Sequence, residues 1–135
     1  MLELSAATRA VAAEPQLQPA VAVLEREVCR LTGAREATVI ALDRTRGAVW
    51  TRDGSAISEE VHALVTRVAQ SGLRAVFGHA LFEPIGWSPA CAVLAVRRRT
   101  YDRFEPDDIA LISALAGGVA ATLNRLIGAA IGARP

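Results

Sequence analysis

The sequence contains no lysine, and it is poor in aromatic residues and in cysteine. All 15 basic residues are arginine, the aromatic fraction is 4%, and two cysteines occur in 135 residues. We attribute the arginine bias to a GC-rich coding sequence rather than to separate selection of each guanidinium group. The net charge of +1 provides no bulk attraction to nucleic acid or to an anionic membrane, so we expect neither as a partner.

Patterns of metal ligands and secretion signals are also missing. Cys29 and Cys91 lie far apart, and neither has a second cysteine or a histidine at zinc-site spacing. The two histidines, His62 and His79, have no second ligand in a recognisable pattern. We therefore expect no metal and no cofactor. The N-terminal residues lack the basic and apolar regions of a secretory signal, and we expect a cytoplasmic protein.

No catalytic motif is present. No serine has the context of a nucleophile elbow, and no glycine-rich phosphate loop occurs. The acidic pairs at 59–60 and 107–108 fall in the first turns of expected helices, where the helix dipole explains them. We expect a protein that is not an enzyme. A minor cysteine-dependent enzyme that uses Cys91 is an alternative.

A narrow apolar seam predicts the first helix, over residues 17–32. Its apolar residues recur at spacings of four and three, and Gly33 follows as a C-terminal stop. The seam consists of Leu17, Val21, Leu24, Val28 and Leu31. Because it spans only about two heptads, we expect it to dock on a sheet or on a second copy rather than to form a free coiled coil.

Short β-branched and apolar runs, separated by turn residues, predict the strands. The first two runs are joined by a tetrapeptide that ends in Gly47, which favours a hairpin. The last run is apolar almost throughout, as in a central strand covered on both faces. The predicted strands span 37–43, 48–52, 73–77, 79–85 and 89–98.

Two more helices complete the pattern. Ser58 as N-cap and Gly72 as stop bound an amphipathic helix. The last helix begins at Pro106, and Arg125 is its only charge between 109 and 127. A helix without a continuous polar face needs cover on both sides.

A glycine pair in this last helix favours a close neighbour. Gly117 and Gly118 cost about 2 kcal/mol relative to alanine in a helix interior, and the close approach of another element would offset that cost. We favour a second subunit over cover within one domain. A membrane span is an alternative that Arg125 disfavours, and a break at the glycines is another. The expected dimer interface adds to the seam the residues Leu111, Leu115, Gly118, Val119 and Thr122.

The only basic cluster follows the last predicted strand. Arg97, Arg98 and Arg99 are consecutive, and Arg103 follows soon after. Alternation along a strand end sends neighbouring arginines to opposite faces, so they do not form one phosphate-reading stripe. We expect a solvated edge or a local ion pair with Asp102.

The order of helix, two strands, helix, three strands and helix resembles a GAF domain. The segments LEREVCRLTGAREATVIALD and CAVLAVRRRTYDRFEPDDIALISALAGGVAATLNR carry the resemblance. It covers residues 17–127, between an N-terminal extension, 1–16, and a C-terminal tail, 128–135. PAS domains and other profilin-like folds are close alternatives to this assignment. The resemblance implies an α+β fold, in which a sheet of about five antiparallel strands carries the N- and C-terminal helices on one face and one helix on the other.

The resemblance also implies a function. It indicates a non-enzymatic sensory or protein-interaction module of a bacterial signalling or transcription-regulation pathway, a homodimer through its terminal helices, with a signalling protein or an output domain as partner. A sensor of a small ligand is the alternative, with a reduced pocket because only LRAVFGHALFEPIG stands where ligand-binding members carry a longer lid. If a cavity exists, we expect Trp50, Phe77 and Phe82 to line it.

Overall fold

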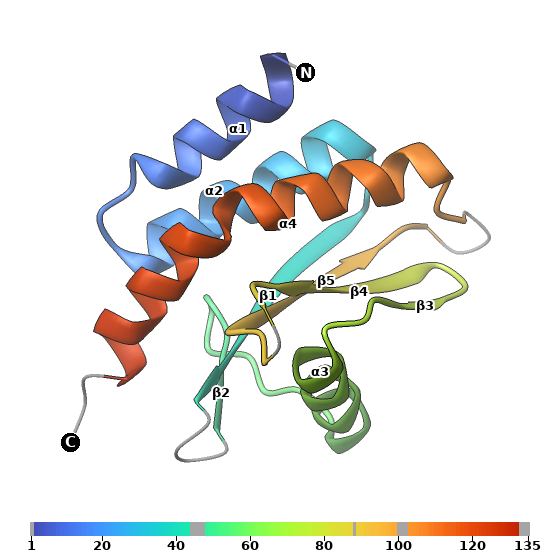
Figure 1. The fold of residues 1–135 in the computed structure, drawn as a ribbon. Coiled ribbons are helices and arrows are strands. Elements are labelled where there is room, and N and C mark those ends of the chain that lie inside the picture. Colours follow the sequence, from blue (N-terminus) through green and yellow to red (C-terminus); the bar gives the residue numbers. More distant parts are fainter. Residues whose placement is uncertain (1, 44–47, 88, 100–102, 133–135) are drawn as a thin grey trace.

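A five-stranded antiparallel sheet lies at the centre of the computed structural model, which describes residues 2–43, 48–87, 89–99 and 103–132 (Figure 1). The strand order is β2-β1-β5-β4-β3, and every neighbouring pair is antiparallel. All five predicted strands are confirmed in position. They are β1 (Glu36–Asp43), β2 (Ala48–Trp50), β3 (Ala75–Phe77), β4 (Ala80–Ile85) and β5 (Ala92–Arg97).

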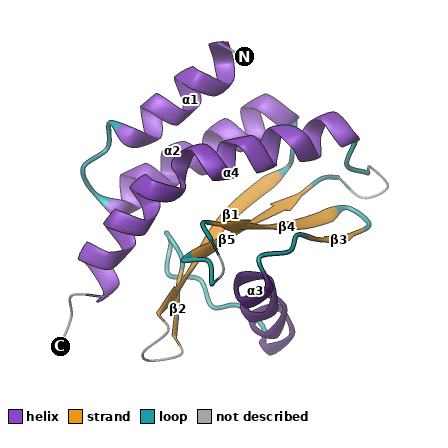
Figure 2. Cartoon of the chain, in the orientation of Figure 1, coloured by secondary structure: helices purple, strands orange, loops and turns teal. Residues whose placement is uncertain are grey.

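Helices cover the two faces of this sheet unequally. On one face lie α1 (Leu2–Ala12), α2 (Leu17–Thr32) and α4 (Pro106–Ile127), and α3 (Glu59–Ser71) lies alone on the other (Figures 1 and 2). A short π-helical segment, Gly128–Gly132, continues α4. The predicted α+β class is confirmed, with the N- and C-terminal helices together on one face and a single helix on the other.

Strand alternation divides the apolar side chains between two cores. On β1, Val39 faces α2 and α4, whereas the next residue, Ile40, packs with Val65 and Val68 of α3. The central strand β5 divides in the same way, since Leu94 belongs to the first core and Val93 to the second. Successive side chains of a strand point to opposite faces, so this division follows directly from the sequence.

The helix ends follow the predicted signals. Ser58 Oγ accepts a hydrogen bond from the Val61 backbone N–H at 3.2 Å, which caps α3. Gly33 and Gly72 end α2 and α3 in the left-handed conformation, with φ near 70°. Pro106 occupies the start of α4. Gly47 and Asp102, the expected turn residue and the expected arginine partner, lie outside the described residues.

Arg98 fastens the end of β5 to both long helices. Its Nη1 donates to the Thr32 carbonyl in the last turn of α2 at 3.2 Å and to Asp108 Oδ2 in the first turn of α4 at 2.8 Å. The guanidinium lies 5.7 Å from the centre of the Phe104 ring. The acidic partner of Arg98 is therefore Asp108, and the expected pair with Asp102 is not tested because Asp102 lies outside the described residues.

The apolar seam of α2 lies inside the core of one chain. The sheet face is wide enough to take α2 and α4 side by side, so their apolar residues meet the sheet and each other. The expected interface residues that are buried in this core are Leu17, Val21, Leu24, Val28, Leu115 and Val119. These residues are not available to a second copy, which corrects the predicted dimer surface. Of that surface, Leu31, Leu111, Gly118 and Thr122 keep some exposure.

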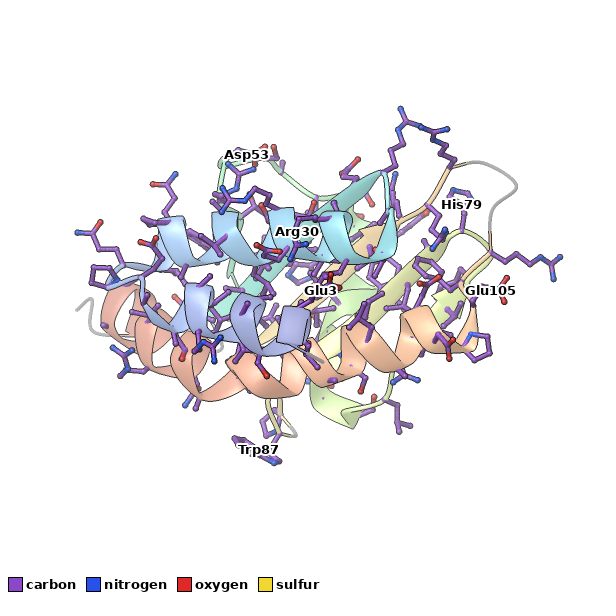
Figure 3. All side chains as sticks on the ribbon, turned by 90° about the horizontal axis from the view of Figure 1, so that it is seen from above. Glu3, Arg30, Asp53, His79, Trp87 and Glu105 are labelled. Carbon is purple, nitrogen blue, oxygen red and sulfur yellow. The ribbon has the colours of Figure 1, made fainter. Side chains whose placement is uncertain are left out.

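The N-terminal extension contains a helix that the sequence analysis does not predict. In the view of Figure 3 α1 runs between α2 and α4, alongside both helices, and it buries Ala7 and Val11. A Cβ on Gly118 would lie 3.0 Å from Thr8 Oγ1, whereas a Cβ on Gly117 would meet no heavy atom within 4 Å. A close approach at the glycine pair is confirmed at Gly118, but the neighbour is α1 of the same chain, and α4 continues without a break.

Packing on the sheet accounts for part of the apolar character of α4. The segment Pro106–Ala130 is long and apolar enough to cross a membrane by length and composition alone. The core helix of a soluble protein passes the same test, and α4 buries Ile112, Leu115 and Leu123 against the first core.

The two adjacent glycines should respond differently to alanine. Gly117→Ala should raise the free energy of unfolding by about 1 kcal/mol, because alanine is the better helix former and the added methyl meets open space. Gly118→Ala should give no gain or a loss, because its methyl would press on Thr8. Urea denaturation measures both. In a Thr8→Ala background Gly118→Ala should recover the gain, and equal gains in the wild-type background would contradict the α1 contact.

Candidate ligand-binding cleft

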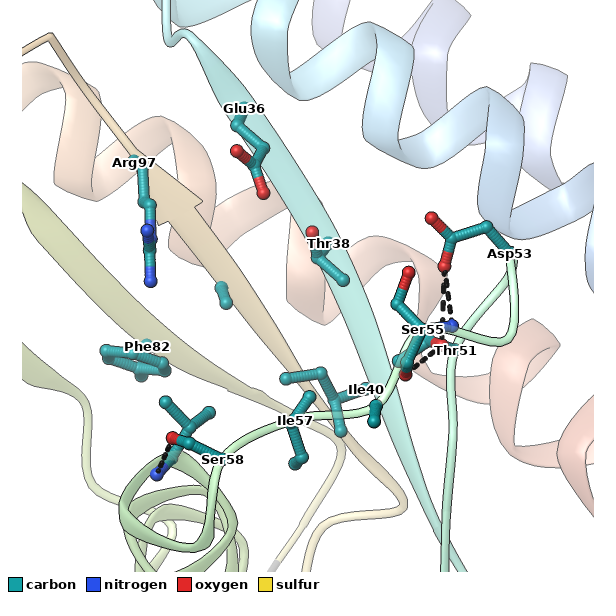
Figure 4. Close-up of a pocket in the computed structure, with 13 residues that line it drawn as sticks. Glu36, Thr38, Ile40, Thr51, Asp53, Ser55, Ile57, Ser58, Phe82 and Arg97 are labelled. Carbon is teal, nitrogen blue, oxygen red and sulfur yellow. Dashed lines mark hydrogen bonds between the residues drawn. The ribbon is translucent and has the colours of Figure 1, made fainter.

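A cleft of about 380 Å³ opens between the sheet and α3, on the face away from the long helices (Figure 4). Strands β1, β4 and β5 form its floor, and the segment 51–58 and the first turn of α3 form its wall. A volume of this size falls in the range of small-molecule sites.

The floor of the cleft is apolar. Ile40 of β1, Phe82 of β4 and Ala95 of β5 all project from the sheet face that α3 covers. Ile57 and Val61 close the same region from the wall. Because α3 covers only part of this sheet face, these side chains form a hollow rather than a continuous core.

A hydrogen-bonded turn shapes the wall. The Thr51 hydroxyl donates to the Ser55 carbonyl at 2.9 Å, and the Ser55 backbone N–H donates to Asp53 Oδ1 at 3.0 Å. Gly54 adopts the positive φ of 76° that this turn requires. The side-chain and backbone hydrogen bonds of Ser55 hold the pKa of Asp53 below its ordinary value. Asp53 therefore stays ionised at neutral pH and serves the turn rather than proton transfer.

Two opposite charges stand at one end of the cleft. Glu36 begins β1 and Arg97 ends β5, and the two residues are direct partners in the strand register. Figure 4 shows both side chains at the rim of the cleft, with Arg97 directed toward Phe82. Among the described residues, neither charged group makes an ion pair. Thr38 lies between Glu36 and Ile40 on the same face, so the cleft grades from charged to apolar.

A buried carboxylate on the helical side positions the wall. Glu25 of α2 accepts the Val39 backbone N–H at 2.9 Å with Oε2, and Arg52 donates to its Oε1 at 2.7 Å. Gln18 of α2 donates to the Arg52 carbonyl at 2.9 Å. The hydrogen bond and the charge of Glu25 raise the pKa of the Arg52 guanidinium. The chain that leaves β2 is thus tied to α2 at the start of the cleft wall.

The three aromatic residues expected to line a cavity lie in different places. Phe82 lines the cleft and is 5% exposed. Phe77 is 58% exposed on the edge strand and meets the Phe82 ring edge-on, with 6.5 Å between ring centres. Trp50 packs on the opposite face of the sheet, against the first core, because its register partner Ala41 faces the long helices.

The sequence patterns do not predict the polar lining of the cleft. The missed residues are Glu36, Thr38, Thr51, Asp53, Ser55, Ser58 and Arg97. One signal was present, because the polar residues Glu36 and Thr38 alternate with Ala37 and Val39, which indicates that the face they share is not buried at this end of the strand. The register that brings Glu36 beside Arg97 is a property of the fold.

Neither cysteine is placed as a nucleophile. Cys91 is buried, and its thiol donates to the Ile85 carbonyl at 3.4 Å. Burial raises the pKa of the Cys29 thiol, and the charges of Glu25 and Glu36 raise it further. Within the described part of the chain no three His, Cys, Asp or Glu side chains gather as a metal site would require.

The architecture is that of GAF domains. The GAF domain of the potassium sensor histidine kinase KdpD from Escherichia coli superposes with a TM-score of 0.76 at 18% identity, over 98% of this chain and 99% of that one. The GAF domain of a phosphoenolpyruvate-protein phosphotransferase from Acinetobacter gives 0.75 at 12% identity, over 98% and 96%. The corresponding domain from Coxiella burnetii gives 0.74 at 18%, over 98% and 96%. No family model and no curated protein matches the sequence. The chain therefore has a GAF-like fold.

Removal of the Glu25 carboxylate should destabilise the protein through the sheet rather than through the ion pair. Glu25→Ala leaves the Val39 N–H buried without an acceptor, so the free energy of unfolding should fall by about 1–3 kcal/mol. Glu25→Gln keeps an acceptor oxygen and should cost less. Arg52→Ala should cost less than about 1 kcal/mol, because Arg52 is exposed. Urea denaturation gives the order, and an Arg52→Ala cost equal to that of Glu25→Ala would contradict it.

Proposed function

We propose that the chain is a non-catalytic sensory module of a bacterial signalling pathway, acting in the cytoplasm, and that it binds a small molecule in the cleft beside α3. The observation that carries the proposal is the cleft itself, which combines an apolar floor with charged groups that have no ion-pair partner within the described chain. It favours the ligand sensor over the module that acts only through protein contacts. The similar folds that belong to a sensor kinase and to phosphotransferases support a role in signalling.

The end of β5 offers a route from the cleft to the long helices. Arg97 lines the cleft, and its neighbour Arg98 points to the opposite face, where it bonds Thr32 of α2 and Asp108 of α4. A ligand that shifts this strand end changes the geometry at the end of one helix and the start of another. The helices are thus the output side of the module, which a signalling partner or an output domain would read.

We further propose that the chain forms a homodimer, through a surface other than the buried seam residues. The outer side of α4 exposes Ala110, Ala114, Gly117 and Ala121, which are small enough for a second helix to approach closely. This surface is continuous with α1, so a dimer would place two copies of the helical layer against each other and leave both clefts open.

Native mass spectrometry of the protein purified from a bacterial host tests the ligand. We expect the additional mass of one small molecule per chain, lost on denaturation. Ala95→Phe fills the cleft floor and should abolish the additional mass, whereas Ala63→Phe, on the exposed side of α3, should retain it. A bare wild-type chain that stays bare after incubation with a bacterial metabolite extract would contradict a sensor of small molecules.

Light scattering during size-exclusion chromatography tests the dimer. Gly117→Arg should convert a wild-type dimer into a folded monomer, because the site offers open space within the chain and the new charge would oppose a second copy. Ala63→Arg, on α3, serves as the control and should remain dimeric. A monomeric wild type, or a dimer that tolerates Gly117→Arg, would refute this surface.

A further inference from the structure

Glu36 and Arg97 at the end of the cleft are both exposed, and neither makes an ion pair among the described residues. Three ion pairs join different parts of the described chain, Glu25 with Arg52 at 2.7 Å, Arg74 with Glu83 at 2.5 Å and Arg98 with Asp108 at 2.8 Å. Glu36 and Arg97 are direct register partners on adjacent strands, where an ion pair would be easy to form. No such pair is present, and Arg97 is directed over the cleft instead (Figure 4).

A carboxylate and a guanidinium on adjacent strands distinguish between ligands of different charge. A ligand with only a carboxylate gains Arg97 but meets the like charge of Glu36, and a ligand with only an ammonium gains Glu36 but meets Arg97. A ligand that carries both groups satisfies both residues. Guanidinium binds carboxylate with two parallel hydrogen bonds, and carboxylate accepts hydrogen bonds from ammonium.

The rest of the cleft fixes the orientation of such a ligand. From the charged end, β1 presents first the Thr38 hydroxyl and then Ile40, and Phe82 and Ala95 extend the apolar surface on the neighbouring strands. A zwitterionic head at the charged end therefore places an apolar substituent over Ile40 and Phe82.

We propose that the cleft binds a zwitterionic amino acid, with its carboxylate on Arg97, its ammonium on Glu36 and an apolar side chain over Ile40 and Phe82. This inference rests on the proposed function, since it names the chemical class of the ligand for the same cleft. A guanine-like base also offers hydrogen-bonding groups for a carboxylate and a guanidinium, so guanosine is included among the compounds tested.

Two matched ligand series test the need for both charges. The first contains L-phenylalanine, 2-phenylethylamine and 3-phenylpropanoate, which share one apolar tail. L-phenylalanine carries both charges, 2-phenylethylamine only the positive charge and 3-phenylpropanoate only the negative charge. The second contains L-norvaline, butylamine and pentanoate in the same order. Each is titrated into the ¹⁵N-labelled full chain. At least one amino acid should shift the amides of Thr38, Phe82 and Ala95, with a dissociation constant about tenfold or more below those of its amine and its acid.

Variants assign each charge. Arg97→Gln should weaken amino acid binding about tenfold and leave binding of the amine unchanged or stronger. Glu36→Gln should weaken amino acid binding and leave binding of the acid unchanged or stronger. Arg26→Gln and Glu105→Gln are matched controls on exposed residues remote from the cleft, and both should bind as the wild type does.

The outcomes separate this inference from the proposed function. An amine or acid that binds as tightly as its amino acid, or amino acids that shift no cleft amide, would overturn the zwitterion. Guanosine that shifts those amides more strongly than either amino acid would also overturn it, while the cleft would stand as a ligand site. A retained molecule of another chemical class, seen by native mass spectrometry, would likewise overturn the zwitterion and leave the cleft as a ligand site. A chain that binds neither series and retains no molecule would overturn both.

Discussion

The carboxylate of Glu25 is the interaction on which the arrangement of this fold around its cleft depends. Strand β2 pairs with β1 only from Ala41 onward, so the N–H of Val39 has no strand partner on that side and lies in the core. A buried amide without an acceptor is costly, and Glu25 supplies the acceptor from α2. Its second oxygen binds Arg52. One side chain thus completes the sheet, joins it to the helical layer and fixes the start of the cleft wall.

The two faces of the sheet differ in composition because successive side chains of each strand point to opposite faces. The face toward α2 and α4 is largely apolar and carries the larger core, and α1 packs on these two helices, close to Gly118 of α4. The other face grades from Glu36 and Arg97 to an apolar floor, and α3 covers only part of it. The larger of the two buried clusters lies on the helical face, and the cleft lies on the other. Arg98 joins the end of β5 to α2 and α4.

Sequence patterns predict the elements of this fold well and its partners less well. Caps, glycine stops and β-branched runs place five strands and three helices, because those signals are local. The seam of α2 shows which side of the helix needs cover but not what covers it, and the cover is the chain's own sheet rather than a second copy. Trp50 and Phe82 are equivalent as aromatic strand residues, and only the register sends them to opposite faces. For the same reason the proximity of Glu36 and Arg97 becomes apparent only when β1 and β5 are paired.

Hydrogen–deuterium exchange, with and without a bacterial metabolite extract, tests most directly whether the cleft is the sensing site. A ligand bound in the cleft should slow exchange in residues 36–40 and 51–61, which form the first half of β1 and the cleft wall, with a smaller change at the α2 and α4 ends that Arg98 joins. Exchange in the body of α1 should not change. Unaltered exchange around the cleft, or slowing confined to the helical layer, would contradict the cleft as the sensing site.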